Sequence, residues 1–478
     1  MATTVVPVSE TQAIMDELKK QANQILSSAS NVDLESFHVG SAGNFPYYWQ
    51  DSATLKFNQK TYDWIKSALA TRTAGESVSL DGVFTNEYLS AITAITYTLS
   101  QADQVKLNQV NQNTTDQQGA LLRAWKQAFG SLPTPTSGDT ILDAIIDTIR
   151  TKWATNPNTT LSDMQNARDL SSLLANAPAS GQAVIPIFAN YLNAVGGGIS
   201  LIDTITLNQG ILKDLRNAIN APSAQNGGVQ LNDGTQDYYP AYPVATQLSD
   251  IVNGLKDTGN AINLKMQVSK FSSTEVTVSV SGGTSFNIPF LDFFSLGASG
   301  HASYFKDHLV QNSSSIEIEM DFTGVTMVEF GPKAYDVSSR LGWLYADVIQ
   351  KAIANGTQDV SGFKFSPNPQ IDFSENGPFG YLSAVGICNY PTIKITVTSS
   401  NYESVKTVFQ EESSWTVSFL GIPLGSVSQS YKQTDVNVDA SSGSVSVTLS
   451  PPPELVAGTQ DDSVGFVLGV QPNYPAAS

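Results

Sequence analysis

The stretch TEVTVSVSGGTSFNIPF, residues 274–290, marks the region where the sequence changes its hydrophobic period. Within residues 276–280 valine alternates with threonine or serine, and Gly282–Gly283 follows. Such alternation predicts a β-strand, and a glycine pair between two alternating runs predicts a hairpin. The alternation recurs in SSSIEIEMDF, residues 313–322, so we expect a β region after about residue 265.

Upstream of residue 265, apolar residues recur every three or four positions, as in residues 139–153. This period predicts amphipathic helices, and their lengths suit an antiparallel bundle. The polar residues NQNTT, 111–115, are expected to connect two of them. The expected helices cover about residues 9–26, 54–73, 86–111, 116–129, 139–153, 160–175, 207–219 and 244–262.

The sequence therefore predicts a segregated α+β fold. A helical bundle is expected over residues 1–265, with a Pro/Gly/Tyr-rich loop or small hairpin at 221–243. A mainly antiparallel, β-sandwich-like domain with one inserted helix, at about 338–355, is expected over residues 266–478.

Two finer features are predicted within the β domain. Residues 285–297 and 414–425 form a weak internal repeat, because SFNIPFL in the first resembles SWTVSFL in the second. The repeat predicts two similar hairpins, explained either by shared turn chemistry or by duplication. The tail from about residue 451 is rich in proline at its ends, so we expect it to be irregular and on the surface.

Composition limits the function classes. Of the 478 residues only 14% are charged, against about 25% in average globular chains. Acidic residues outnumber basic ones by 43 to 25, which gives a net charge of −18. This charge disfavours non-specific binding to nucleic acid, and no basic patch with interleaved aromatic residues is present.

No catalytic, cofactor or metal motif was found, so we expect a protein that is not an enzyme and binds no cofactor or metal. Phosphate-binding loops and nucleophile elbows are absent. Cys388 has apolar neighbours and is expected to be a buried structural thiol. His301 and His308 are better explained as exposed loop residues than as metal ligands, and the carboxylates of 317–321 as the polar face of a strand.

The segment with the most unusual composition runs from Leu170 to Ile202, 33 residues without a charge. Residues 183–202, AVIPIFANYLNAVGGGISLI, approach the roughly 20 residues that span a bilayer core. One interpretation is a membrane-active hairpin hidden within the bundle; the other is a buried core helix with a glycine-rich elbow. The proposed apolar arm contains Ile185, Ile187, Phe188, Tyr191 and Leu192, and the proposed helix breakers are Pro186, Gly196, Gly197 and Gly198.

These observations favour a non-enzymatic, toxin-like protein whose bundle sequesters the membrane-active segment. Its β domain would bind a target membrane or cell-surface ligand. Tyr238, Tyr239 and Tyr242, in the loop expected within the helical bundle, are the predicted recognition loop. The alternative is a structural or ligand-binding module, such as a particle component or a glycan or peptide binder, without membrane activity. An enzyme using carboxylates brought together from distant positions is a third class.

The expected partners and location follow from the same features. No nucleic acid partner is expected, and a homo-oligomer is compatible with the sequence. The start MATTVVPVSE has no basic and apolar signal-peptide pattern. We therefore expect a protein that is cytoplasmic when made, with release or delivery, if any, by a non-classical route.

Overall fold

The structure is a computed structural model. It divides into two compact units, each assembled from separated stretches of chain. The helical unit comprises Tyr88–Gly228 and Ala334–Gln370, and the β-rich unit comprises Met1–Glu87, Val229–Lys333 and Ile371–Ala477. The structure describes residues 36–37, 44–46, 59–73, 76–136, 139–165, 167–231, 234–271, 275–280, 284–289, 294–298, 315–375, 377–411, 414–419, 422–424, 431–451 and 464–477.

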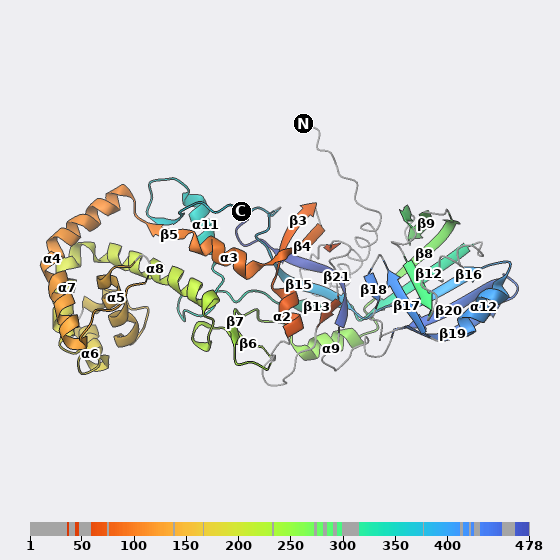
Figure 1. The fold of residues 1–478 in the computed structure, drawn as a ribbon, viewed down its shortest axis with the longest axis horizontal. Helices are drawn as coiled ribbons and strands as arrows, with labels where there is room; N and C mark the ends of the chain where they lie inside the picture. Colours follow the sequence, from red (N-terminus) through yellow and green to blue (C-terminus); the bar gives the residue numbers. More distant parts are fainter. Residues whose placement is uncertain are drawn as a thin grey trace, which may run out of the picture. The chain divides into compact units, whose positions relative to one another are not determined.

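A helical region over about residues 84–220 confirms the predicted helical N-terminal part of the fold (Figure 1). A short sheet of β5 (Ile95–Thr98) and β14 (Gly362–Phe365) lies in the same unit, as does α11 (Ala346–Asn355). The helices of the region are α3 (Phe84–Thr93), α4 (Gln101–Phe129), α5 (Ile141–Thr148), the π-helix η1 (Ile149–Trp153), the 3-10 helix η2 (Asp163–Gln165), α6 (Ala167–Asn176), α7 (Val184–Val195), the 3-10 helix η3 (Gly196–Gly198) and α8 (Ile199–Asn220).

Helix α4 differs from the prediction, because it continues through residues 111–115, where a connection was expected. Thr114 is buried, and its hydroxyl donates to the carbonyl of Val110 at 2.8 Å. The hydroxyl of Thr115 donates to the Asn111 carbonyl at 3.0 Å. Polar side chains here bond to the preceding turn instead of ending the helix. Ser100 caps its start and Gly130, with a left-handed φ of 77°, follows its end.

A mainly antiparallel β region follows the helices, as predicted. Its largest sheet has ten strands in the order β10-β9-β8-β12-β16-β20-β19-β17-β11, with β18 on β17, and is curled as a half-barrel (Figure 1). Helix α12 (Tyr402–Glu411) interrupts the strands. The strands are β8 (Ala261–Phe271), β9 (Glu275–Val280), β10 (Thr284–Pro289), β11 (Phe294–Ala298), β12 (Ser315–Thr323), β16 (Thr392–Thr398), β17 (Ser414–Phe419), β18 (Ile422–Leu424), β19 (Tyr431–Asp439) and β20 (Ser444–Ser450).

Strand β12 shows why the alternating sequence folds this way. Ile316, Ile318 and Met320 are buried on one face, while the intervening carboxylates occupy the other. On that polar face Glu319 pairs with Lys265 of β8 at 3.2 Å, and its pKa is lowered, because hydrogen bonds from Asn263 and Lys265 outweigh desolvation by burial. The polar-face interpretation of residues 317–321 therefore fits this strand.

The prediction that the tail after about residue 451 is irregular is wrong in part, because residues 464–473 form strand β21. β21 (Val464–Asn473) is an interior strand of the sheet β13-β15-β21-β2, between β15 (Tyr381–Cys388) and β2 (Asn44–Pro46). Its central residues are buried. Strand β13 covers Thr326–Glu329.

The expected helix over 54–73 is also wrong in its second half. Helix α2 (Gln59–Ile65) ends early, and β3 (Ser67–Thr73) pairs with β4 (Glu76–Val83), which also pairs with β1 (Ser36–Phe37). Pairing with a neighbouring strand overrides the helical spacing. The expected helix over 9–26 lies outside the described residues.

Two further segments differ in detail. The expected pair of similar hairpins is wrong: β17 and β18 of the second copy pair with each other, but β10 and β11 of the first copy lie at opposite edges of the sheet, where β10 pairs with β9 and β11 with β17. The inserted helix α11 begins at Ala346 rather than near 338, because residues 334–344 are held in a loop by bridges between Ala334 and Leu344 and between Asp336 and Leu341. Helix α9 (Leu248–Lys256) lies within the expected 244–262.

Candidate functional site

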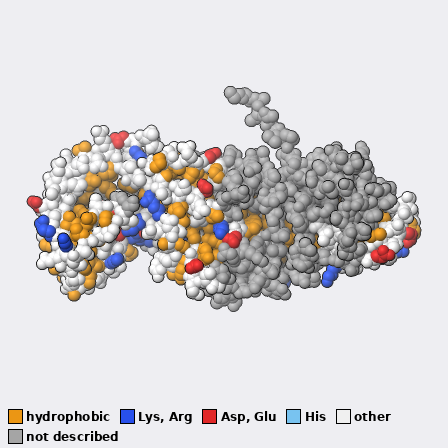
Figure 2. Space-filling model, viewed as in Figure 1, with side chains coloured by type: hydrophobic (Ala, Val, Ile, Leu, Met, Phe, Trp, Pro, Cys, Tyr) orange, Lys and Arg blue, Asp and Glu red, His pale blue; other side chains and the backbone are white. Residues whose placement is uncertain are grey.

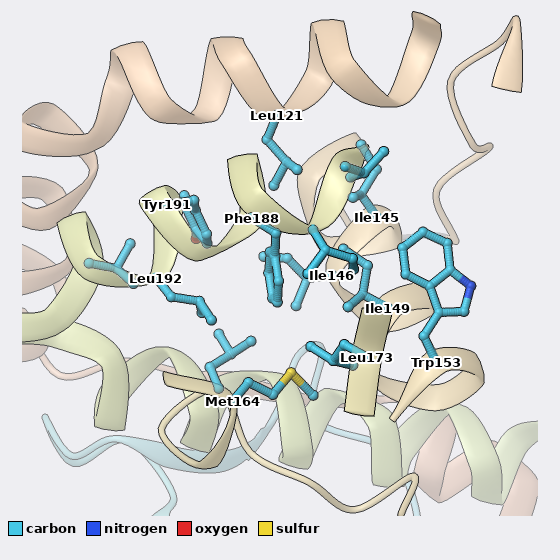
Figure 3. Close-up of a cluster of buried hydrophobic side chains, with 14 of the residues drawn as sticks. Leu121, Ile145, Ile146, Ile149, Trp153, Met164, Leu173, Phe188, Tyr191 and Leu192 are labelled. Atoms are coloured by element: carbon cyan, nitrogen blue, oxygen red, sulfur yellow. The ribbon is translucent and has the colours of Figure 1, made fainter. Parts of the chain in front are cut away.

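The uncharged segment forms α6 from Leu170 onward, α7, η3 and the first residues of α8. The apolar side of α7 lies in the core of the helical unit. In Figure 3, the Phe188 side chain of α7 points away from Leu121 of α4, toward Ile146 of α5 and Leu173 of α6. Trp125 of α4 stacks on Trp153 of η1, with ring centroids 5.5 Å apart, at one end of this cluster. The apolar face of α7 thus packs against hydrophobic side chains of the neighbouring helices.

The nine predicted segment residues divide between two faces. Ile185, Phe188, Tyr191, Leu192 and Gly198 are buried, and Phe188 has no exposed surface. Ile187 is partly buried, whereas Pro186, Gly196 and Gly197 are exposed. The segment therefore has one face in the core and one at the surface, which is the pattern of an amphipathic helix rather than of a helix buried all round.

The residues predicted to break the helix do not break it. Pro186 is the third residue of α7, within the first turn, where backbone N–H groups have no intrahelical acceptor. The three glycines form one 3-10 turn, and α8 begins directly after it. The run Val184–Asn220 is the one helix, in the part of the chain that the structure describes, long and apolar enough to cross a membrane, and 44% of its most apolar window is buried.

Gly198 has a specific packing role. A Cβ on this residue would lie 2.4 Å from Cγ2 of Val110 on α4, so only glycine allows this approach. A Cβ on Gly197 would have no neighbouring atom within 4 Å. A Cβ on Gly196 would contact only the side-chain nitrogen of Gln165, at 3.8 Å. One of the three glycines is therefore required by the contact with α4.

Polar contacts at the edges of the segment were not predicted from the sequence. The side-chain amide of Gln165 donates to the Leu192 carbonyl near the end of α7, at 2.9 Å. Asp203, the first charged residue after the uncharged run, is buried and accepts hydrogen bonds from the backbone N–H groups of Leu161 and Ser162. The hydroxyl of Ser162 also donates to Asp203, at 2.6 Å. The only sequence signal for this contact was the position of the charge.

The tyrosine loop is placed less favourably for recognition than the sequence indicated. β6 (Val229–Gln230) and β7 (Tyr238–Tyr239) form a small hairpin. Of the two structures predicted for residues 221–243, a loop or a small hairpin, the hairpin is the one that forms. Tyr242 is fully buried, and its hydroxyl and that of Thr85 lie 2.8 Å apart. Tyr239 packs against Tyr62, with ring centroids 5.6 Å apart, and is half-buried like Tyr238. Tyr242 therefore cannot contact a ligand without unfolding the loop.

The remaining candidates are structural or lie outside the described residues. Cys388 is buried in β15, and burial raises its pKa well above the ordinary value, so the thiol stays protonated and unreactive. Within the described ranges, no group of three or more His, Cys, Asp and Glu side chains could hold a metal ion. The two histidines considered above, His301 and His308, lie outside those ranges.

Comparison with protein-family models, with curated proteins and with solved structures found no match for this chain.

Proposed function

We propose that the protein is a non-enzymatic, toxin-like protein in which the helical unit sequesters α7 and the β-rich unit binds a target membrane or cell-surface ligand. The observation that carries this proposal is the position of α7: an uncharged helix whose apolar face is covered by α4, α5 and α6. A helix of this kind is soluble only while its neighbours cover it.

The contacts that hold α7 in the helical unit suit its release into a membrane. They are almost entirely hydrophobic, and such contacts are non-directional and can be exchanged for contacts with lipid chains. Release would break the Gln165–Leu192 hydrogen bond, whereas Asp203 would keep the start of α8 attached to residues 161–162. The run would thus open at η3, between α7 and α8.

Dye release from phosphatidylcholine vesicles tests the proposal. The protein, intact or nicked by protease, is added at pH 7 and at about pH 5, where partial protonation of Asp and Glu reduces the −18 charge. We expect release in at least one of these conditions. No release in any of them, from protein that stays folded, would contradict the membrane role.

A reversible cross-link makes the test specific for α7. In the double variant Val110→Cys, Gly198→Cys the two Cβ atoms would start 3.3 Å apart, close to the 3.5–4.5 Å typical of disulfides. Val110→Cys also removes one of the two γ-carbons that crowd Gly198. The oxidised protein should regain its dye-release activity only after reduction, and the single variant Val110→Cys, which leaves Gly198 in place, is the control.

The alternative, a structural or ligand-binding module, is favoured by the Gly198–Val110 contact, because a close helix crossing is what a permanent core needs. The cross-link separates the two functions. If the oxidised and reduced forms release dye equally, α7 stays in the core and another segment acts on the membrane. If neither releases dye and the protein is folded, the module without membrane activity is the better description.

A further inference from the structure

A cavity of about 520 Å³ lies within the helical unit, between α8 and the loop 334–340. Its walls are mainly apolar, with Leu207 and Ile211 of α8 facing Val337 of the loop. The amide of Asn158 holds this loop in place by donating to the carbonyls of Val337 and Ser338, at 3.2 and 2.6 Å. This volume falls within the range of small-molecule sites.

Arg150 contributes the first of two guanidinium groups to the cavity, from the π-helix η1. Arg150 is only 2% exposed. Its Nη1 donates to the Pro157 carbonyl at 2.9 Å, and its Nη2 donates to the Asp147 carboxylate at 2.8 Å. In the described part of the chain, the buried Nε has no hydrogen-bond partner. π-helices are rare in proteins, and the single turns that do occur are often found at functional sites.

Arg340 contributes the second guanidinium, from a strained backbone. Its φ is 59°, in the left-handed region that a residue of this size rarely adopts. Nε and Nη2 each donate to a carboxylate oxygen of Asp214, at 2.6 Å, and the Tyr335 hydroxyl donates to the same carboxylate at 2.8 Å. The bidentate pair fixes the guanidinium and leaves Nη1 outside it.

Gly210 of α8 leaves the space between the two guanidinium groups open. A Cβ on this residue would lie 3.5 Å from Nη2 of Arg150 and 3.9 Å from Nη2 of Arg340. The two groups therefore converge on the same point of the helix, where every residue except glycine would place a side chain. In Figure 2 the described part of the helical unit shows hydrophobic side chains with Lys and Arg side chains between them.

We infer that this cavity binds a small amphipathic carboxylate, with the apolar body against Leu207, Ile211 and Val337 and the carboxylate between Arg150 and Arg340. Each arginine already has an aspartate partner, so the local charge is nearly balanced. A singly charged carboxylate suits this balance better than a doubly charged phosphate, and planar guanidinium groups match its geometry. This site is independent of the proposed membrane role.

Calorimetric titration with octanoate, and with octanamide as its neutral analogue, tests the site. Octanoate should bind the wild-type protein about tenfold more tightly than octanamide, the effect of one charge-assisted hydrogen bond. Gly210→Leu fills the space between the guanidinium groups and should abolish octanoate binding. Gly210→Ala, which makes only ordinary contacts and favours the helix, should weaken it and provides the test if the leucine variant does not fold.

Gly119→Ala is the matched control, because it adds a methyl group beside the guanidinium of Arg123 on α4, away from the cavity. It should bind octanoate like the wild type. Arg340→Lys should remove the preference for octanoate over octanamide, because lysine cannot form the same planar contact. The site is overturned if wild-type protein does not bind octanoate, if octanamide binds equally well, or if the folded Gly210 variants bind octanoate unchanged.

Discussion

Helices α7 and α8 belong to one helical run, yet they are held by different kinds of contact. α7 has no charged residue, and its six buried residues pack in the hydrophobic cluster. α8 buries six residues of which one, Asp203, is a carboxylate, and it carries Asp214 and Arg216, which bond to other segments. The two arms meet at the 3-10 turn η3.

The difference indicates how the two arms would respond to a change of environment. Hydrophobic contacts of α7 have no preferred direction, so another apolar environment can replace them. The hydrogen bonds of α8 depend on individual partners: Arg216, for example, donates to the carbonyls of Ile92 and Ile95, at 3.1 and 2.7 Å. α7 is therefore the arm that can change partners, and α8 is the arm that anchors the run.

The largest expected effect is that of Phe188→Ala in α7. Phe188 is fully buried at the centre of the cluster, so its truncation should lower the free energy of unfolding by about 3–5 kcal/mol. Chemical denaturation measures this. Asn190→Ala, on the exposed face of the same helix, should change stability by less than about 0.5 kcal/mol.

Phe188→Asp cannot by itself separate this effect on stability from the proposed membrane role. A buried unpaired carboxylate should destabilise the helical unit still more, so its loss of dye release alone would not be informative. A Phe188→Ala protein that is destabilised but still releases dye would show that α7 acts through its overall apolar character. A cost below about 1 kcal/mol would contradict the central position of Phe188.

The next largest effect is expected at the anchor. Asp203→Asn replaces one acceptor oxygen with an N–H donor that faces the backbone N–H groups of Leu161 or Ser162. We expect a loss of about 1.5–3 kcal/mol, the range for hydrogen bonds to a charged group. A double-mutant cycle with Ser162→Ala measures the part that passes through the Ser162 hydroxyl. Additive effects would mean that this side-chain bond contributes nothing.

The glycines between the arms give a smaller and sharper comparison. Gly198→Ala should destabilise the protein by about 1–2 kcal/mol, because its methyl group would overlap Val110. Gly197→Ala should be neutral or stabilising, because nothing lies within 4 Å and alanine favours helix. Thermal unfolding of the two variants, side by side, checks this. Equal effects would mean that the close contact with α4 does not form.

The sequence predicted those parts of the fold that depend on local pattern. The alternation in β12 and the helical period in α5 arise within single elements, and both form. Strands β5 and β21 were missed, because each is defined by a distant partner. Thr98 of β5, for example, bonds to Gly362, 264 residues later, and no local pattern reports such a pairing.

The candidate site could be predicted only in part for the same reason. Composition identified the uncharged segment, but it did not show which face is buried or that Gly198 is set by Val110. Pro186 looks like a helix breaker in the sequence, but a proline is tolerated in the first turn of a helix, and only the structure shows where α7 begins. The convergence of Arg150 and Arg340 beside Gly210 had no sequence signal, since the three residues come from separate segments.

The smallest effect is expected where α5 and α8 meet at charged groups. Burial raises the pKa of Asp139, and so do the nearby carboxylates Asp143 and Asp147, although Lys213 of α8 opposes them. Because the folded-state pKa lies above the unfolded value of about 3.9, the charged carboxylate lowers stability at pH 7, and this penalty disappears as the pH falls below both values.

Asp139→Asn should therefore raise the free energy of unfolding at pH 7 by no more than about 0.5 kcal/mol, since solvent still screens this half-buried group. At about pH 3 the variant and the wild type should be equally stable. Asp116→Asn, an exposed change of the same charge on α4, controls for the net charge of −18. A larger gain from Asp116→Asn than from Asp139→Asn would mean that overall charge, rather than the α5–α8 contact, limits stability. Lowering the pH would then stabilise the molecule as a whole and would not distinguish α7 from α8. The two helices would differ only in the contacts that hold them, which are apolar for α7 and include hydrogen bonds to charged groups for α8.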